Sequence, residues 1–296
     1  MMQIYELTYQ GAKIGVKSRG AELCSFVPKN GTEYIWQGDE NIWGGHSPIL
    51  FPIVCALKND TVKIDGKPYH MRKHGFLMQQ EFQLVERGED FLEFVFHATP
   101  ETKEMYPFSY AVYIKHRIWK DGFETTFRVE NLDEKTIPMC LGGHPGFIIP
   151  REEGEAFSDY ILQFPYVENG KNAMCPSAYL IEGEEYFAPL AGSDTLALKH
   201  SYFDKKDALM LMDLKSREVS LIHKDTKKGL RFYFPGFDVL GVWTKPGANA
   251  DYICLEPWCG LPAYETETGN FEDKPFVKMV APKEVFAVSY KMEVVA

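Results

Sequence analysis

The chain has 296 residues, of which 45% are hydrophobic and 25% are charged, and its formal net charge is −10. The acidic balance disfavours a nucleic acid or another polyanion as partner, since such ligands require a basic surface, and it fits a neutral substrate. No apolar run approaches the roughly 18 residues of a membrane-spanning helix, so we expect no membrane partner.

Cysteine usage and the N-terminal residues indicate the compartment. No CxxC spacing occurs, so a zinc or thioredoxin-like site is not expected, and most cysteines should be small buried apolar side chains. The N-terminal residues lack the basic and apolar segments of a secretory signal. The sequence therefore predicts a cytoplasmic protein with free thiols at Cys24, Cys55, Cys140, Cys175, Cys254 and Cys259.

Short alternating runs separated by turn residues dominate the first half of the chain, which is typical of antiparallel hairpins. The predicted strand pairs are 22–27 with 34–37 around Asn30-Gly31, 61–64 with 68–71 around Asp65-Gly66, 81–85 with 91–97 around residues 87–90, and 109–119 with 123–129 around Asp121-Gly122. In the last pair the period is two, so the pattern predicts sheet and not helix. One face of 109–119 should carry Val112, Ile114, His116 and Ile118.

The second half continues in the same way. Predicted pairs are 219–223 with 230–234 and 239–244 with 252–255, and a further strand at 285–294 closes the chain. Helical turns are expected only at 101–105 and 205–210. No linker, repeat or low-complexity tract divides the sequence. We therefore predict an all-β fold in which residues 1–296 form a single, mainly antiparallel two-layer β-sandwich domain.

His144 lies in a glycine-rich stretch that is a candidate site. Gly142, Gly143 and Gly146 let a ligand or a second backbone approach closely. Pro145 restricts the backbone of His144 to extended conformations, which gives its imidazole a defined direction. The stretch suits a general acid, and a tight turn that happens to contain a histidine is an equally compatible interpretation.

His74 is a second candidate, since a histidine followed by Gly75 and Phe76 after a short strand can line a pocket. Its basic neighbours favour a neutral imidazole, which donates one hydrogen bond and accepts another. A loop histidine without a functional role is the alternative.

Glu256 follows the apolar run 252–255, and glutamate is rarely buried unless it is paired. Burial raises the pKa of a carboxyl group and makes it a better general base near neutral pH. A strand-end glutamate paired with a surface lysine is the alternative. Trp258 offers the flat apolar surface that a ligand pocket uses. No nucleophile elbow, Walker loop, dinucleotide motif or HExxH motif occurs, so we expect proton transfer on a neutral substrate without a cofactor or metal.

The chain resembles the aldose 1-epimerase (galactose mutarotase) family, in particular its LacX-like branch. The matching segments occur in the family's order between residues 20 and 263. They are Gly20-Ala21-Glu22-Leu23, residues 48–54, His74-Gly75-Phe76, residues 142–147, Leu214-Lys215-Ser216-Arg217 and Leu255-Glu256-Pro257-Trp258. The resemblance implies a galactose mutarotase-like β-sandwich, often called a supersandwich.

The resemblance also implies residue roles for a small aldose substrate. Glu256 matches the family's general base, His144 its general acid, and His74 a histidine that hydrogen-bonds the sugar. Ring opening, rotation about the C1–C2 bond and closure then give the other anomer. Asp207, Phe147 and Trp258 are the further residues expected to contact the sugar.

One position departs from the family pattern. Relatives carry a sugar-binding arginine soon after the Phe-Pro-Ile-Val run, and here that position holds Ala56. Arg72 or Lys58 is expected to compensate by reaching the pocket, since an arginine supplies several fixed hydrogen-bond donors.

Three functions remain open at this stage. The leading hypothesis is an aldose 1-epimerase acting on a hexose. A non-catalytic carbohydrate-binding or sensing protein on the same fold is the second. A hexose-6-phosphate mutarotase is the third, and it would need Arg72, Lys73 and Lys58 at the pocket mouth for the phosphate. The sequence names neither the sugar nor the oligomeric state.

Overall fold

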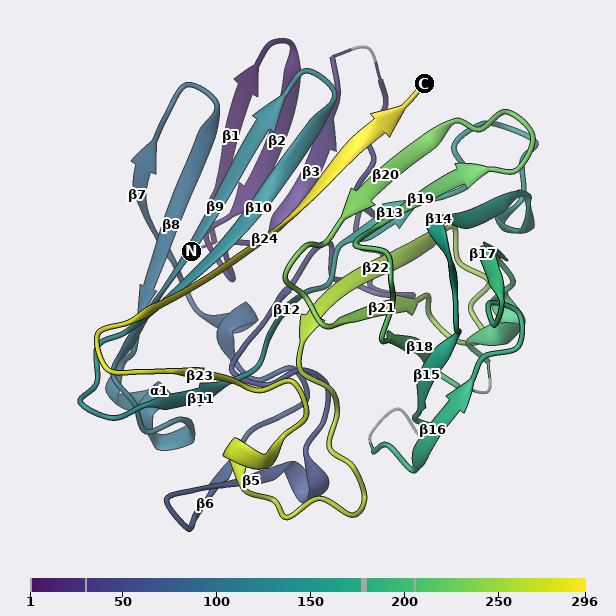
Figure 1. Cartoon of the computed structure of the whole chain (residues 1–296). Coiled ribbons are helices and arrows are strands. Elements are labelled where there is room, and N and C mark those ends of the chain that lie inside the picture. The colour runs from purple at the N-terminus through teal and green to yellow at the C-terminus, as the bar shows by residue number, and fades with distance from the viewer. Residues whose placement is uncertain (1, 30, 177–179, 205) are drawn as a thin grey trace.

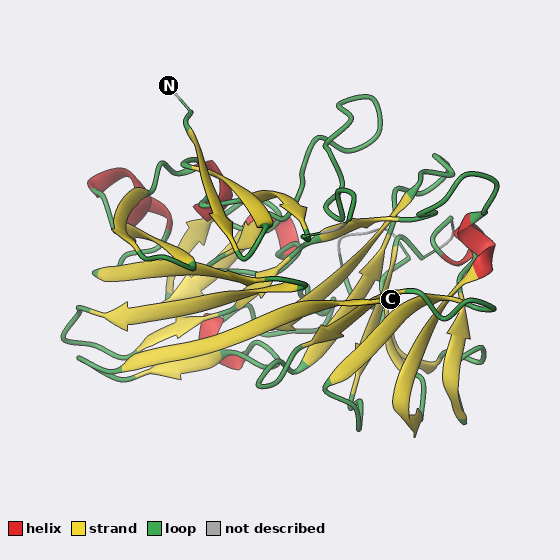
Figure 2. Ribbon diagram, turned by 90° about the horizontal axis from the view of Figure 1, so that it is seen from above, coloured by secondary structure: helices red, strands yellow, loops and turns green. Residues whose placement is uncertain are grey.

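The structure is a computed structural model that describes residues 2–29, 31–176, 180–204 and 206–296. Strands dominate and the helices are short (Figure 2). Within the described residues, no helix has the length and apolarity that crossing a membrane requires. The helices are α1 (Pro100–Met105) and the 3₁₀ turns η1 (Lys58–Asp60), η2 (Leu77–Gln79), η3 (Phe157–Asp159), η4 (His200–Tyr202) and η5 (Phe271–Asp273).

One layer is a nine-stranded antiparallel sheet in the order β17-β14-β19-β20-β24-β10-β9-β8-β7. The long strand β24 lies in its middle and separates early strands from late ones (Figure 1). The strands are β7 (Gln83–Arg87), β8 (Phe91–His97), β9 (Tyr110–Trp119), β10 (Gly122–Asn131), β14 (Tyr160–Glu168), β17 (Ser193–Ala197), β19 (Glu218–His223), β20 (Gly229–Tyr233) and β24 (Val285–Val295).

The second large sheet has eight strands, in the order β16-β15-β18-β21-β22-β12-β4, with β13 pairing β22 beside β12. Its central strand β22 is buried along its whole length. The strands are β4 (Ile49–Leu50), β12 (Leu141–Gly143), β13 (Gly146–Ile148), β15 (Lys171–Met174), β16 (Gly183–Tyr186), β18 (Ala208–Met212), β21 (Val239–Trp243) and β22 (Tyr252–Cys259).

Three smaller sheets complete the fold. A three-stranded sheet packs against the early half of the nine-stranded sheet, and the two remaining sheets have two strands each, one a hairpin and the other a pairing of segments far apart in the sequence. The strands are β1 (Ile4–Tyr9), β2 (Ala12–Lys17) and β3 (Leu23–Val27), then β5 (Thr61–Ile64) with β6 (Lys67–His70), and β11 (Ile137–Met139) with β23 (Lys278–Val280).

Aromatic side chains join the layers. Between the large sheets, the rings of Phe147 on β13 and Phe232 on β20 lie 5.8 Å apart. The three-stranded sheet meets the nine-stranded one where Phe26 and Phe123 lie 5.1 Å apart. One cluster of buried apolar side chains extends through these contacts. The predicted all-β, mainly antiparallel sandwich is therefore confirmed.

Most predicted elements are also confirmed. The pairs β5–β6, β7–β8, β19–β20 and β21–β22 form, and α1 covers the expected turn at 101–105. β9 and β10 pair from Gly122↔Trp119 to Asn131↔Tyr110. The buried face of β9 is the predicted one, with Val112, Ile114, His116 and Ile118. All six cysteines are buried free thiols.

Two local predictions are wrong. Residues 34–37 form no strand with β3. The chain leaves the three-stranded sheet there and crosses to the eight-stranded sheet, where Ile35 bridges Phe147. Asn30 of the predicted turn lies outside the described residues. The helical turn predicted at 205–210 is instead the start of β18, whose five residues are all buried. A continuous apolar run of this length is typical of a central strand, and Lys205 lies outside the described residues.

Gly75 holds His74 against the loop after β4. It has φ +72°, and its bridge to Phe51 brings the two backbones together. A Cβ atom at this position would lie 2.2 Å from the carbonyl oxygen of Phe51. Gly66, in the β5–β6 turn, has almost the same φ of +73°, but a Cβ there would have no heavy atom within 4 Å. Comparing alanine substitutions at these two glycines therefore separates the cost of backbone strain from the cost of steric overlap.

We predict that Gly75→Ala destabilises the protein much more than Gly66→Ala. Both changes place alanine in the left-handed region, which costs about 1–2 kcal/mol. Only the first also forces a side chain into a main-chain oxygen. Urea unfolding of both variants measures the difference in free energy of unfolding, and equal losses would contradict this account of the 74–76 turn.

Candidate functional site

A cavity of about 270 Å³ lies at the junction of β18, β21 and β22 with two long loops. The histidine and glutamate residues singled out in the sequence all line it. Larger surface hollows of about 790 and 700 Å³ are lined mainly by polar and charged side chains on other faces. We place the site in the smaller cavity, because it gathers buried ionisable groups.

Glu256 and His144 form the floor of the cavity. Oε2 of Glu256 lies 3.0 Å from Nε2 of His144, and the two side chains are 2% and 9% exposed. The contact does not have hydrogen-bond geometry, so Oε2 has no hydrogen-bond partner, and neither does Nδ1 of His144. Two buried polar atoms are therefore left for groups of a ligand.

Burial controls the ionisation of this pair. It raises the pKa of Glu256 well above the usual carboxyl range, and it lowers the pKa of His144 to about 3. Desolvation disfavours a charge on either side chain. Glu256 is therefore protonated, His144 is neutral, and the pair carries no net charge. Moving that proton from Glu256 to His144 gives a base and an acid side by side.

The sequence around His144 fixes its ring. The backbone N–H of His144 donates to Pro48 O at 3.0 Å, and Leu255 N–H donates to Pro145 O at 3.2 Å. The ring packs against Trp43 and Trp243, with centroids 5.0 and 5.4 Å away, and the two indoles also contact each other. The imidazole is held by backbone pairing on two sides and by aromatic packing.

His74 lies beside this pair as a neutral donor. Its Nδ1 accepts a hydrogen bond from the N–H of Cys55 at 3.1 Å, so its proton is on Nε2. Burial lowers the pKa of His74 well below its usual value, and the neighbouring His144 adds to the effect. Its ring lies 5.6 Å from that of His144. A partly exposed N–H is thus available to a ligand oxygen.

Lys73 and Asp207 provide a second polar wall. Nζ of Lys73 lies 3.8 Å from Oδ2 of Asp207, and the indole N–H of Trp243 donates to Oδ1 at 3.3 Å. The indole holds the carboxylate in place, so the wall combines a fixed acceptor with a cation. Such a combination suits a ligand with several hydroxyl groups.

The other predicted site residues divide into two groups. Asp207 and Trp258 line the cavity, whereas Arg72, Lys58 and Phe147 do not. Arg72 is exposed outside it, and Lys58 donates to the carbonyl oxygen of Glu265 at 2.6 Å. Phe147 is fully buried between the sheets. The expected compensation for Ala56 by Arg72 or Lys58 has no support in their positions.

Sequence reasoning missed several wall residues. Lys73 was expected only for a phosphate group, and Trp43, Trp243, Met78 and Lys245 were not proposed at all. The pattern Trp43-Gly44-Gly45 resembles the glycine-rich stretch around His144 and is a usable signal. Nothing local marks the others, because their positions depend on loops that meet only in the folded chain.

Metal binding is the other function to which these groups are suited. One atom each of His144, Cys254 and Glu256 lies within 4.8 Å of the others. Zinc takes nitrogen, thiolate and carboxylate ligands at about 2.0–2.3 Å, so these residue types suit it. Cys254 does not line the cavity, however, and it packs beneath Trp43 and Trp243. We therefore interpret the site as an acid–base pair.

Comparison with known proteins finds related sequences along most of the chain. The sequence profile of the aldose 1-epimerase family matches residues 3–272. The chromosomal and plasmid forms of protein LacX from Lactococcus lactis subsp. lactis are each 34% identical over 98% of both chains.

Solved structures extend the similarity to the fold. A galactose mutarotase-related enzyme from Lactobacillus acidophilus superposes with a TM-score of 0.92 at 28% identity, covering 99% of this chain and 98% of that one. A galactose mutarotase-like protein from Lactobacillus casei gives a TM-score of 0.92 at 25% identity, covering 99% and 100%. The fold is thus galactose mutarotase-like, and the chain belongs to the aldose 1-epimerase family.

Proposed function

We propose that the protein is an aldose 1-epimerase that interconverts the α and β anomers of a free hexose. The observation that carries this proposal is the buried Glu256–His144 pair, 3.0 Å apart at the floor of a sugar-sized cavity. The protein exchanges only protons with the sugar and no oxidation or group transfer occurs, so the mechanism requires no cofactor. The buried free thiols support a cytoplasmic location.

The reaction begins when the proton of the pair moves to His144 as the sugar binds. Glu256, now a carboxylate, takes the proton from the anomeric hydroxyl, and the imidazolium of His144 gives its proton to the ring oxygen. The C1–O5 bond breaks as the C1=O1 double bond forms. Rotation about C1–C2 exposes the other face of the aldehyde. Closure reverses both proton transfers and restores the pair.

The remaining wall residues bind and orient the sugar. The Nε2–H of His74 and the ammonium of Lys73 are donors, and Asp207 is an acceptor. Trp43 and Trp243 supply apolar surfaces for the C–H groups of the sugar. Fixing the ring in this way keeps O1 and O5 within reach of the base and the acid.

The charge at the cavity favours a free hexose over a hexose 6-phosphate. A phosphate group needs clustered cations, and of Arg72, Lys73 and Lys58 only Lys73 lines the cavity. Lys245 is the other lysine there, and His74 and His144 are held neutral by burial. Lys73 faces the carboxylate of Asp207, which would repel a phosphate.

The first prediction concerns the base. Glu256→Gln preserves the shape of the side chain but removes the proton acceptor, so kcat should fall at least ~10²-fold while sugar binding survives. Polarimetry on freshly dissolved α-glucose and α-galactose measures the rate, and calorimetry measures binding. A folded variant that mutarotates at the full rate would refute the assignment. Binding without any catalysis by the unmodified protein would indicate a carbohydrate-binding protein instead.

The second prediction separates the two histidines. The proton of His144 moves in the transition state, so His144→Gln should lower kcat more than it raises KM. His74 donates a hydrogen bond before and during the reaction, so the cost of His74→Asn should fall more on KM. Steady-state kinetics on both variants gives the comparison, and the reverse pattern would mean that their roles are exchanged.

The third prediction concerns the cation at the wall. Lys73→Met keeps the alkyl chain and removes a charged donor, whose hydrogen bonds are worth about 1.5–3 kcal/mol. KM should therefore rise roughly 10- to 100-fold with a smaller change in kcat. Arg72→Ala is the matched control, because Arg72 is the adjacent exposed cation, and it should leave KM within about twofold. Equal effects of the two changes would place sugar recognition elsewhere.

A further inference from the structure

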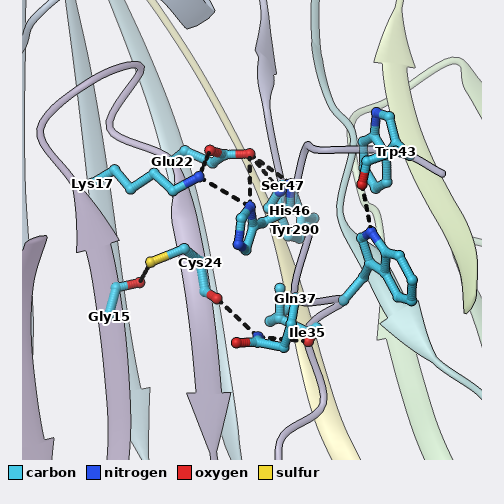
Figure 3. A network of polar contacts seen from close by, with 11 residues as sticks. Gly15, Lys17, Glu22, Cys24, Ile35, Gln37, Trp43, His46, Ser47 and Tyr290 are labelled. Carbon is cyan, nitrogen blue, oxygen red and sulfur yellow. Dashed lines mark hydrogen bonds and ion pairs between the residues drawn. The ribbon is translucent and has the colours of Figure 1, made fainter. Parts of the chain in front are cut away.

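Glu22 is the centre of a polar network next to the cavity wall (Figure 3). It belongs to the Gly20–Leu23 motif, to which the mechanism assigns no role. Its Oε1 accepts hydrogen bonds from the backbone N–H groups of His46 at 2.7 Å and Ser47 at 3.0 Å. Its Oε2 accepts one from Nζ of Lys17 at 2.8 Å. The side chain is only 13% exposed, so these contacts are shielded from water.

The segment that Glu22 holds supports the backbone of His144. Residues 46–50 run antiparallel to residues 142–146, with Ile49 opposite Gly143. The N–H of His144 donates to Pro48 O at 3.0 Å, and the N–H of Gly146 donates to His46 O at 2.9 Å. Pro48 O, which accepts from His144, therefore lies one residue beyond the Ser47 amide that Glu22 binds, and His46 O, which accepts from Gly146, belongs to the other residue whose amide Glu22 binds.

The same segment also positions the ring of His144. It continues back to Trp43, whose ring lies 5.0 Å from that of His144 at an interplanar angle of 31°. Its other end is tied to the nine-stranded sheet, where Oγ of Ser47 lies 3.2 Å from the hydroxyl of Tyr290. Displacing residues 46 and 47 would thus shift both the backbone and the packing partner of the imidazole.

Charge and hydrogen bonding explain why a glutamate suits this position. A carboxylate oxygen can accept two amide hydrogen bonds at once, and charge-assisted bonds are stronger than neutral ones. Lys17 balances the charge of Glu22, and its Nζ also lies 3.0 Å from Nδ1 of His46. The network closes a loop that carries two glycines, Gly44 and Gly45, and would otherwise have more conformational freedom.

We propose that Glu22 is a positioning residue, which acts through the 43–48 segment to hold His144 in register with Glu256. The proposal rests on the proposed function for its kinetic part. A shift of about 1 Å between reacting groups can cost ~10²-fold in rate, so a residue outside the cavity can control kcat in this way.

Glu33 provides a matched control within the same region. Its Oε1 also accepts two backbone hydrogen bonds, from Phe26 N–H at 2.8 Å and Ile35 N–H at 2.9 Å. Like Glu22 it is partly buried, but neither Phe26 nor Ile35 adjoins a cavity-lining residue, whereas Ser47 adjoins Pro48 of the cavity wall. A purely structural glutamate should behave as Glu33 does.

The experiment compares Glu22→Ala, Glu22→Gln and Glu33→Ala by urea unfolding and by mutarotation kinetics. We expect the two alanine variants to lose similar stability. Only Glu22→Ala should lose kcat, by at least about tenfold. Glu22→Gln retains one carbonyl oxygen that can accept both amides, so it should recover most of that kcat. If Glu22→Ala does not fold, Glu22→Asp replaces it, since its shorter side chain cannot reach both amides.

An unchanged kcat in Glu22→Ala, or an equal loss in Glu33→Ala, would overturn the proposal. A second readout makes its failure distinguishable from failure of the proposed function. The imidazole NMR signals of His144 should shift in Glu22→Ala and stay in place in Glu33→Ala. If the unmodified protein shows no mutarotation, the proposed function is wrong and these signals alone decide: a selective shift supports the positioning role, and unchanged signals refute it.

Discussion

The burial of a carboxyl group against a histidine is the constraint on which this site depends. An isolated buried carboxylate costs several kcal/mol, and the cost falls when the group is neutral or paired. Glu256 lies within the buried strand β22, and His144 lies on the adjoining segment between β12 and β13. With Glu256 protonated and His144 neutral, the pair carries no net charge, and hydroxyl groups of a bound sugar would supply the missing hydrogen bonds. In the proposed mechanism, the acid and the base thus stay uncharged until a substrate binds.

Close backbone approach makes this arrangement possible. A Cβ at Gly142 would lie 2.6 Å from the indole of Trp258, and one at Gly146 would lie 2.8 Å from that of Trp43. The absence of side chains at these glycines lets both tryptophans pack directly against the backbone next to His144. Because neighbouring strands bring residues 144 and 256 together, their distance is set by sheet register and not by a flexible loop.

Period-two patterns and turn residues were sufficient to predict most strands, because those signals are local. The two wrong predictions fall where long-range packing determines the local structure. The 34–37 run is short and rich in β-forming residues but lies where the chain changes sheets, and the 208–212 run gives no period because it is buried on both faces.

The same limit applies to the site. His74, His144 and Glu256 could be predicted because their neighbours in sequence form recognisable motifs. Lys73 could not be chosen over its neighbour Arg72, because that choice depends on which way one turn faces in the folded chain.

Burial keeps His144 uncharged beside Glu256, and an NMR titration of the His144 imidazole in the unliganded protein measures this charge state. We expect His144 to stay neutral through the mildly acidic range and to take up a proton only near its lowered pKa of about 3. A His144→Gln variant identifies the signal. Protonation of His144 near the ordinary histidine pKa of about 6.5 would contradict the account, since the pair would then be charged before any sugar binds.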